Sequence, residues 1–142
     1  YEQQDFFRAL ANSFMISADD AHGWHPNYSE KYDPTNHAIL GGGPAIKINA
    51  NCKYMTDADG SAVFQALCEK AGVPCQYFVN HSDVLGGSTL GNILTGQMDI
   101  RGVDMGNPIW ALSSRNGFCQ RPRIRSQSLR RILQVIKTTI LH

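Results

Sequence analysis

Residues 44–80 have the sequence PAIKINANCKYMTDADGSAVFQALCEKAGVPCQYFVN, which predicts a strand, a helix and a second strand in succession. Pro44–Asn51 alternates apolar and polar residues, the period expected of a strand. Asp59–Ala71 has helical spacing, and Gln76–Asn80 again has the composition of a strand. Strands that alternate with helices favour an α/β layered fold over a sandwich or a bundle.

The central helix has start and stop signals of its own. Asp59 or Ser61 is expected to be its N-cap, and Gly72 is expected to end it. The face predicted to be buried carries Val63, Leu67 and Cys68.

The segments on either side continue the same alternation. The expected elements are a helix over Tyr1–Asn12, a short strand over Ser13–Ala18, a loop over Pro26–Gly43, a tight turn over Gly87–Gly91, a short helix over Asn92–Gln97 and a strand over Ile100–Met105. The chain starts at Tyr1 inside an amphipathic pattern, so we expect it to be a fragment of a longer protein.

Charge divides the 142 residues near Trp110. Residues 1–110 hold all 12 acidic side chains and 6 basic ones, whereas residues 111–142 hold 7 basic side chains and no acidic one. We therefore expect a domain over 1–110 and a divergent basic tail over 111–142, with weak helical spacing in the tail. No apolar run approaches ~18 residues, so no membrane span is expected.

The four cysteines, Cys52, Cys68, Cys75 and Cys119, form no CxxC pair. Their spacing matches neither a disulfide framework nor a cysteine zinc site. Reduced thiols and a cytoplasmic location are expected.

The most informative local cluster is SADDAHGWHPN at residues 17–27, where Asp19, Asp20, His22 and His25 follow the apolar stretch. Side chains at the end of a strand in an α/β fold face the ligand crevice, and carboxylate and imidazole groups bind zinc. On spacing alone, a surface turn with a capping aspartate and a solvated histidine explains the same residues.

Four stretches in one order carry a resemblance to a known family: ISADDAHGWHPNY, GGGPAIKINANCKYMTD, CEKAGVPCQYFVNHSDVLGGSTLGNI and VDMGNPIWAL. From about Ser13 to Trp110 they resemble the aspartyl aminopeptidase motifs SADMAHAxHPNY, GPxIKxNxxQRYxTD, AGVPxQxFVNRSDxxxGSTIG and DxGxPxLAMHSxRE. The resemblance implies the C-terminal part of a metallo-aminopeptidase catalytic domain, an α/β fold with a mixed sheet flanked by helices.

The resemblance also implies roles for four residues. Asp19 matches an aspartate that binds zinc and touches the substrate, and His22 matches a histidine that contacts the substrate. Lys47 and Tyr54 match two further substrate contacts, and both side chains can donate to a carboxylate or carbonyl oxygen. Without the resemblance, Lys47 is an exposed strand residue and Tyr54 a half-buried aromatic by default.

For the whole protein, the family implies a site with two zinc ions that removes N-terminal Asp or Glu from peptides, and a homo-oligomer. Its general base, the bridging aspartate and other ligands precede the matched segment, so no catalytic residue is expected here. We therefore expect the 142-residue chain to bind zinc weakly and to hydrolyse nothing measurable.

The chain departs from the family pattern at three places. Gly43 stands where a polar residue, often histidine, is common, and Cys52 lies in a stretch that usually has glutamine. Ser113 occupies the position of the second zinc histidine, and serine is a poor zinc ligand. From Ala111 on, a shifted reading frame can encode HSARETASVKDHEYAVKALDGYFK with a stop inside the codon of Val135. We therefore hypothesise that residues 111–142 are out of frame, with a truly divergent basic tail as the alternative.

Two other classes of function stay open. One is a non-catalytic homologue or assembly subunit. The other is a nucleic-acid binder that uses the arginines of the tail, among them Arg125, Arg130 and Arg131. No aromatic residue for base stacking follows Phe118, so binding to nucleic acid is not expected.

Overall fold

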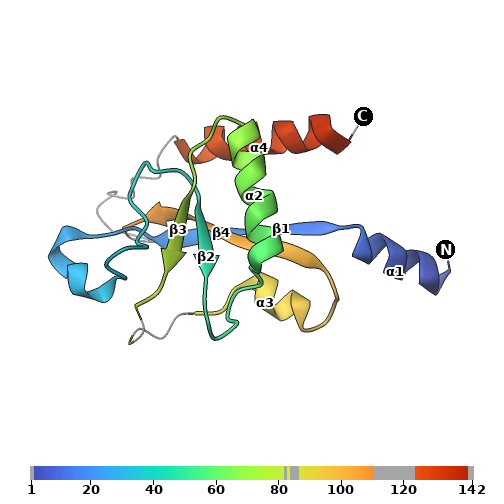
Figure 1. Cartoon of the computed structure of the whole chain (residues 1–142), viewed down its shortest axis with the longest axis horizontal. Coiled ribbons are helices and arrows are strands. Elements are labelled where there is room, and N and C mark those ends of the chain that lie inside the picture. The colour runs from blue at the N-terminus through green and yellow to red at the C-terminus, as the bar shows by residue number, and fades with distance from the viewer. Residues whose placement is uncertain (1, 82, 84–86, 111–123, 141–142) are drawn as a thin grey trace, which may run out of the picture.

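A computed structural model describes residues 2–81, 83, 87–110 and 124–140 of the chain. Figure 1 shows a sheet crossed by helices, with the first helix extending away from the sheet. The elements are α1 (Gln3–Ala11), β1 (Phe14–His22), the 3-10 helix η1 (Pro26–Lys31), β2 (Ala45–Ile48), α2 (Ala58–Lys70), β3 (Gln76–Val79), α3 (Leu90–Thr95), β4 (Arg101–Ile109) and α4 (Ile124–Ile140).

The four strands form one mixed sheet in the order β1-β4-β2-β3. β1 runs parallel to β4 and β2 parallel to β3, whereas β2 and β4 are antiparallel. The predicted α/β class and the mixed sheet flanked by helices are therefore confirmed. β4 lies between two neighbouring strands, and all its residues after Arg101 are buried.

β1 is longer than its apolar sequence predicts. We expected the acidic and histidine residues to follow the strand, but Asp19, Asp20 and His22 lie inside it. The pairing with β4 continues until His22 faces Ile109, so backbone hydrogen bonds extend the strand through its polar residues. Alternation along the strand then decides which side chains share a face.

The α2 helix begins at a different cap from either predicted one. The Asp57 Oδ1 atom accepts a hydrogen bond from the Gly60 amide at 2.6 Å, so Asp57 is the N-cap. Asp59 instead pairs with Arg101 at 3.1 Å. The helix ends as predicted beside Gly72, whose φ of 63° favours glycine.

The main core lies between the sheet and the helices α2 and α4. Its buried side chains are Ile46, Phe64, Cys68, Val73, Val103, Met105 and Ile132. On α2, Cys68 is buried and Leu67 packs against the core, as predicted. Val63 is instead 38% exposed, and Phe64 is fully buried. Ile132 belongs to the basic tail, where the predicted helical spacing corresponds to α4. The division at Trp110 stays a prediction.

Two further predictions concern thiols and membranes. Within the described part of the chain Cys52, Cys68 and Cys75 are free thiols, as predicted, while Cys119 lies outside it. Burial, reinforced by the neighbouring Cys75 thiol, raises the pKa of Cys68 to about 12. None of the described helices has the length and apolar character that crossing a bilayer requires.

Candidate active-site wall

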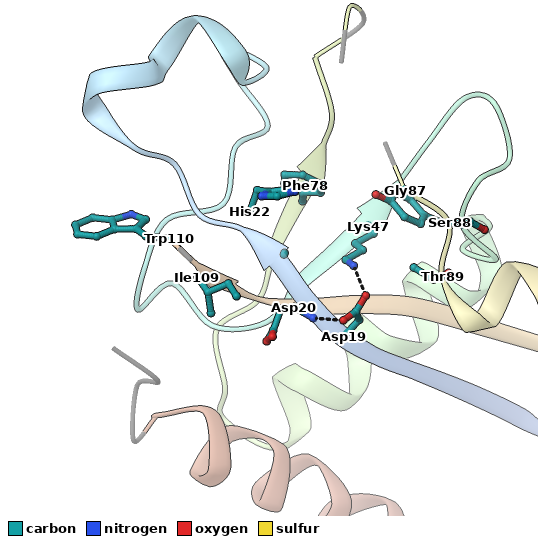
Figure 2. Close-up of a pocket in the computed structure, with 12 residues that line it drawn as sticks. Asp19, Asp20, His22, Lys47, Phe78, Gly87, Ser88, Thr89, Ile109 and Trp110 are labelled. Carbon is teal, nitrogen blue, oxygen red and sulfur yellow. Dashed lines mark hydrogen bonds and ion pairs between the residues drawn. The ribbon is translucent and has the colours of Figure 1, made fainter. Parts of the chain in front are cut away.

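A cavity of about 230 Å³ opens where β1, β2 and the end of β4 meet the segments before α2 and α3 (Figure 2). The structure brings all four predicted site residues to it: Asp19, His22, Lys47 and Tyr54. Gly87, Ser88 and Thr89 also line the cavity, in agreement with the predicted turn beside the site. That turn is shorter than predicted, because α3 begins at Leu90 and contains Gly91.

Lys47 and Asp19 form the charged centre of the cavity. The Lys47 Nζ atom lies 3.5 Å from Asp19 Oδ2, and the lysine side chain is only 6% exposed whereas the aspartate is 59% exposed. Asp19 Oδ1 accepts a hydrogen bond from the Asp20 amide at 2.7 Å (Figure 2). A buried ammonium group is unfavourable unless it meets a compensating partner. Because Lys47 lines the cavity, its ammonium group can also pair with an anionic group of a bound ligand.

Lys47 reaches Asp19 by crossing β4 at Gly106. Asp19 and Ala45 both face Gly106 in the sheet register. A Cβ atom at Gly106 would lie 2.8 Å from the Lys47 Cε atom and 2.7 Å from the Ala21 Cβ atom. Glycine at this position leaves the space through which the lysine side chain passes.

Tyr54 adds a phenol beside the lysine. The Lys47 Nζ atom lies 5.5 Å from the centre of its ring, a cation–π distance. Burial raises the pKa of the Tyr54 phenol, and the carboxylates of Asp104 and Asp19 raise it further, although a hydrogen bond with Asn80 acts in the opposite direction. The phenol stays protonated at neutral pH and can donate a hydrogen bond.

His22 and Trp110 lie at the rim of the cavity, at the ends of β1 and β4. Trp110 is 56% exposed, and its indole nitrogen donates to the Trp24 carbonyl at 3.0 Å. His25 does not line the cavity. Its Nδ1 atom accepts from the Asn27 amide at 3.2 Å and caps η1, whereas the structural alternative considered for this cluster had a capping aspartate and a solvated histidine.

Sequence reasoning did not single out several residues of this region. Gly106 and Trp110 had no predicted role, because their importance depends on which strands lie beside β4. Asp104 and Thr89, joined by a buried hydrogen bond of 2.8 Å, were missed for the same reason.

The described residues fit part of a zinc site. Asp19 presents an exposed carboxylate in the cavity, a suitable oxygen ligand. Nowhere in residues 2–81, 83, 87–110 and 124–140 do three His, Cys, Asp or Glu side chains converge as a metal site. Ser113, the position of the expected second histidine, lies outside the described residues. Asp19 alone does not hold a zinc ion tightly, since zinc needs three or four ligands.

Comparisons with known proteins agree on one family. Residues 1–129 match the model of a family described as aminopeptidase I zinc metalloprotease (M18). A probable M18 family aminopeptidase 2 of Clostridium novyi (strain NT) is 53% identical over 118 residues, which cover 83% of this chain and 27% of the relative.

Solved structures give the same result. Ape4 in its complex with Nbr1 matches 76% of this chain and 21% of its own with 40% identity and a TM-score of 0.74. The mApe1 dodecamer of Saccharomyces cerevisiae matches 75% of this chain and 23% of its own with 29% identity and a TM-score of 0.65. The chain thus spans about a quarter of the length of the proteins that it matches.

Proposed function

Because the chain belongs to the aminopeptidase I (M18) family of zinc metalloproteases, we propose that it forms one wall of the active site of a zinc aminopeptidase that removes acidic N-terminal residues from peptides. The observation that carries this proposal is the convergence of Asp19, Lys47 and Tyr54 on one cavity. His22 at the rim is proposed as a further substrate contact.

The charges in the cavity support a preference for an acidic residue. The ammonium group of Lys47 and the protonated phenol of Tyr54 are both donors, and both suit the carboxylate of an Asp or Glu side chain. The Asp19 carboxylate, on the other side of the lysine, suits the positively charged α-amine of the same residue. An N-terminal Asp or Glu would satisfy all three groups at once.

Asp19 is also the proposed zinc ligand of this segment. The bound metal, two ions in the complete family site, would polarise the scissile carbonyl and supply hydroxide near neutral pH. No catalytic residue is proposed within this chain, and the other ligands and the general base must come from outside the described residues. We therefore expect the 142-residue chain alone to lack measurable activity.

Three further proposals concern the whole protein. A homo-oligomer is proposed because the S. cerevisiae mApe1 structure is a dodecamer. A cytoplasmic location is proposed on the basis of the free thiols of Cys52, Cys68 and Cys75. Residues 111–142 are proposed to be a tail that is either divergent or out of frame, and sequencing of the parent DNA would decide between these two origins. Neither nucleic acid nor a membrane is proposed as a partner.

A chimera tests the proposed activity. Residues 13–110 would replace the matched segment of the Clostridium novyi relative, and the zinc-loaded protein would be assayed on Asp-, Glu- and Leu-p-nitroanilide. The expected result is hydrolysis with a higher kcat/KM for the acidic substrates, and a selective loss of that preference in Lys47→Met. A folded chimera that prefers leucine, or that is inactive beside an active parent, overturns the proposal.

A further inference from the structure

Asp104 in β4 is a buried carboxylate beside the proposed substrate pocket. It is fully buried, and among the described residues no basic side chain forms an ion pair with it. A buried charge without an ion-pair partner is costly, so its hydrogen bonds decide whether the site is tolerated. Its neighbours Val103 and Met105 belong to the apolar core, so by alternation along β4 the Asp104 side chain points to the opposite face of the sheet.

The Asp104 carboxylate joins two segments of the pocket wall. Its Oδ2 atom accepts hydrogen bonds from the Met55 amide at 2.7 Å and from the Thr89 hydroxyl at 2.8 Å. Thr89 is 5% exposed, so its hydroxyl is removed from competing water. Tyr54 directly precedes Met55, and Tyr54 and Thr89 both line the cavity.

The backbone of Asp104 strengthens the attachment on one side. Its amide donates to the Thr56 hydroxyl at 2.9 Å, and that hydroxyl donates to the Asp104 carbonyl at 3.3 Å. The ladder between β2 and β4 pairs only Ala45 and Ile46 with β4. The segment that contains Tyr54 is therefore held beside β4 by hydrogen bonds that involve the side chains of Asp104 and Thr56, and not by the backbone ladder.

The space around the carboxylate admits little movement. A Cβ atom at Gly91 would lie 2.9 Å from Asp104 Oδ1 and 3.0 Å from Oδ2. The Oδ1 atom is buried and has no hydrogen-bond partner among the described residues. Both hydrogen bonds to the side chain therefore fall on Oδ2. Hydrogen bonds to an ionised carboxylate are about twice as strong as neutral ones.

We propose that Asp104 is a positioning residue of the substrate pocket, which holds the Tyr54 segment and Thr89 against β4 and thereby fixes the wall around Lys47. It touches no substrate itself. It acts through the Met55 amide and the Thr89 hydroxyl. The proposal rests on the proposed function, because the pocket is taken to bind an acidic N-terminal residue.

The test uses the full 142-residue chain with three variants, Asp104→Asn, Thr89→Val and Thr89→Ser. Asp104→Asn keeps the shape and removes the charge, Thr89→Val keeps the shape and removes the donor, and Thr89→Ser restores the donor. NMR would record the ring signals of Tyr54, the hydrogen exchange of the Met55 amide and the dissociation constant of L-aspartate. Thermal unfolding of each variant controls for loss of the fold.

We expect Asp104→Asn to shift the Tyr54 ring signals, to speed exchange at Met55 at least tenfold and to weaken L-aspartate binding at least tenfold. Thr89→Val should weaken binding at least fivefold, and Thr89→Ser should return it to within about twofold of the native chain. These numbers follow from the loss of one charge-assisted hydrogen bond. A residue that only stabilises the fold would lower the unfolding temperature in all variants and leave the dissociation constant unchanged.

The outcomes separate this inference from the proposed function. If the native chain binds L-aspartate, and folded Asp104→Asn and Thr89→Val bind it within twofold of the native value, the positioning role is wrong. If L-aspartate does not bind the native chain but the Tyr54 and Met55 signals respond as expected, the substrate proposal fails and the positioning role stands.

Discussion

Replacing Lys47 by methionine should separate the stability of the domain from its affinity for an acidic ligand. The Lys47 side chain is 6% exposed, and within the described part of the chain its one ion pair is a 3.5 Å contact with Asp19, whose side chain is 59% exposed. An ion pair with an exposed partner contributes about 1 kcal/mol or less, whereas burying an ammonium group costs several kcal/mol. Methionine has a similar length and no charge to bury.

From these opposing effects we expect Lys47→Met to leave the free energy of unfolding unchanged or to raise it by about 1–4 kcal/mol. Its affinity for L-aspartate should fall about 10- to 100-fold, since one charge-assisted hydrogen bond contributes about 1.5–3 kcal/mol. Urea denaturation and NMR titration measure the two quantities. Lys31→Met, at an exposed lysine in η1, is the matched control and should change neither by much.

Two results would refute this reasoning. A loss of more than about 1 kcal/mol in the free energy of unfolding of Lys47→Met would mean that the Lys47–Asp19 pair stabilises the fold, against the general behaviour of such pairs. Unchanged binding of L-aspartate in a folded variant would mean that the lysine does not face the ligand.

The remaining predictions concern the strand crossing, the alkaline limit and the metal. Gly106→Ala should destabilise the chain by about 1–3 kcal/mol through overpacking against Ala21 and Lys47, and should weaken L-aspartate binding by displacing the lysine; urea denaturation and NMR titration check both. Burial raises the pKa of Cys68 from 9.0 to about 12, so its thiol ionises more easily in the unfolded chain. Its contribution to stability is then complete below about pH 9 and is lost progressively up to about pH 12; Cys68→Ala should flatten the fall in the free energy of unfolding between about pH 9 and pH 12. The chain alone should bind zinc weakly, Asp19→Asn should bind it more weakly still by calorimetry, and an Asp-capped chromogenic substrate should not be turned over.

The α/β class follows from the sequence because strand and helix periods alternate clearly between residues 44 and 80. The length of β1 does not follow from it, since the polar run after Ala18 looks like a strand end. The pairing with β4, from Asp19 opposite Gly106 to His22 opposite Ile109, keeps that run extended. Local patterns do not reveal which strand will pair beside them.

The sequence predicted those site residues that lie within the family motifs. The sequence around Lys47 and Tyr54 indicates no function by itself. These two residues were identified because they align with substrate contacts in the family motifs. Asp104 and Thr89 are 15 positions apart and meet through folding, so no spacing rule identifies their hydrogen bond. Such contacts follow from the tertiary structure and not from the local sequence.

The most direct test of the substrate wall is an NMR titration of the 142-residue chain with L-aspartate, with L-lysine as the control ligand. We expect weak, saturable binding of L-aspartate, with a dissociation constant on the order of 1 mM, because about two charge-assisted hydrogen bonds supply the free energy of binding. The shifts should centre on Asp19, His22, Lys47 and Tyr54, and L-lysine should leave them unchanged. Equal responses to both amino acids, or shifts centred away from these four residues, would contradict it.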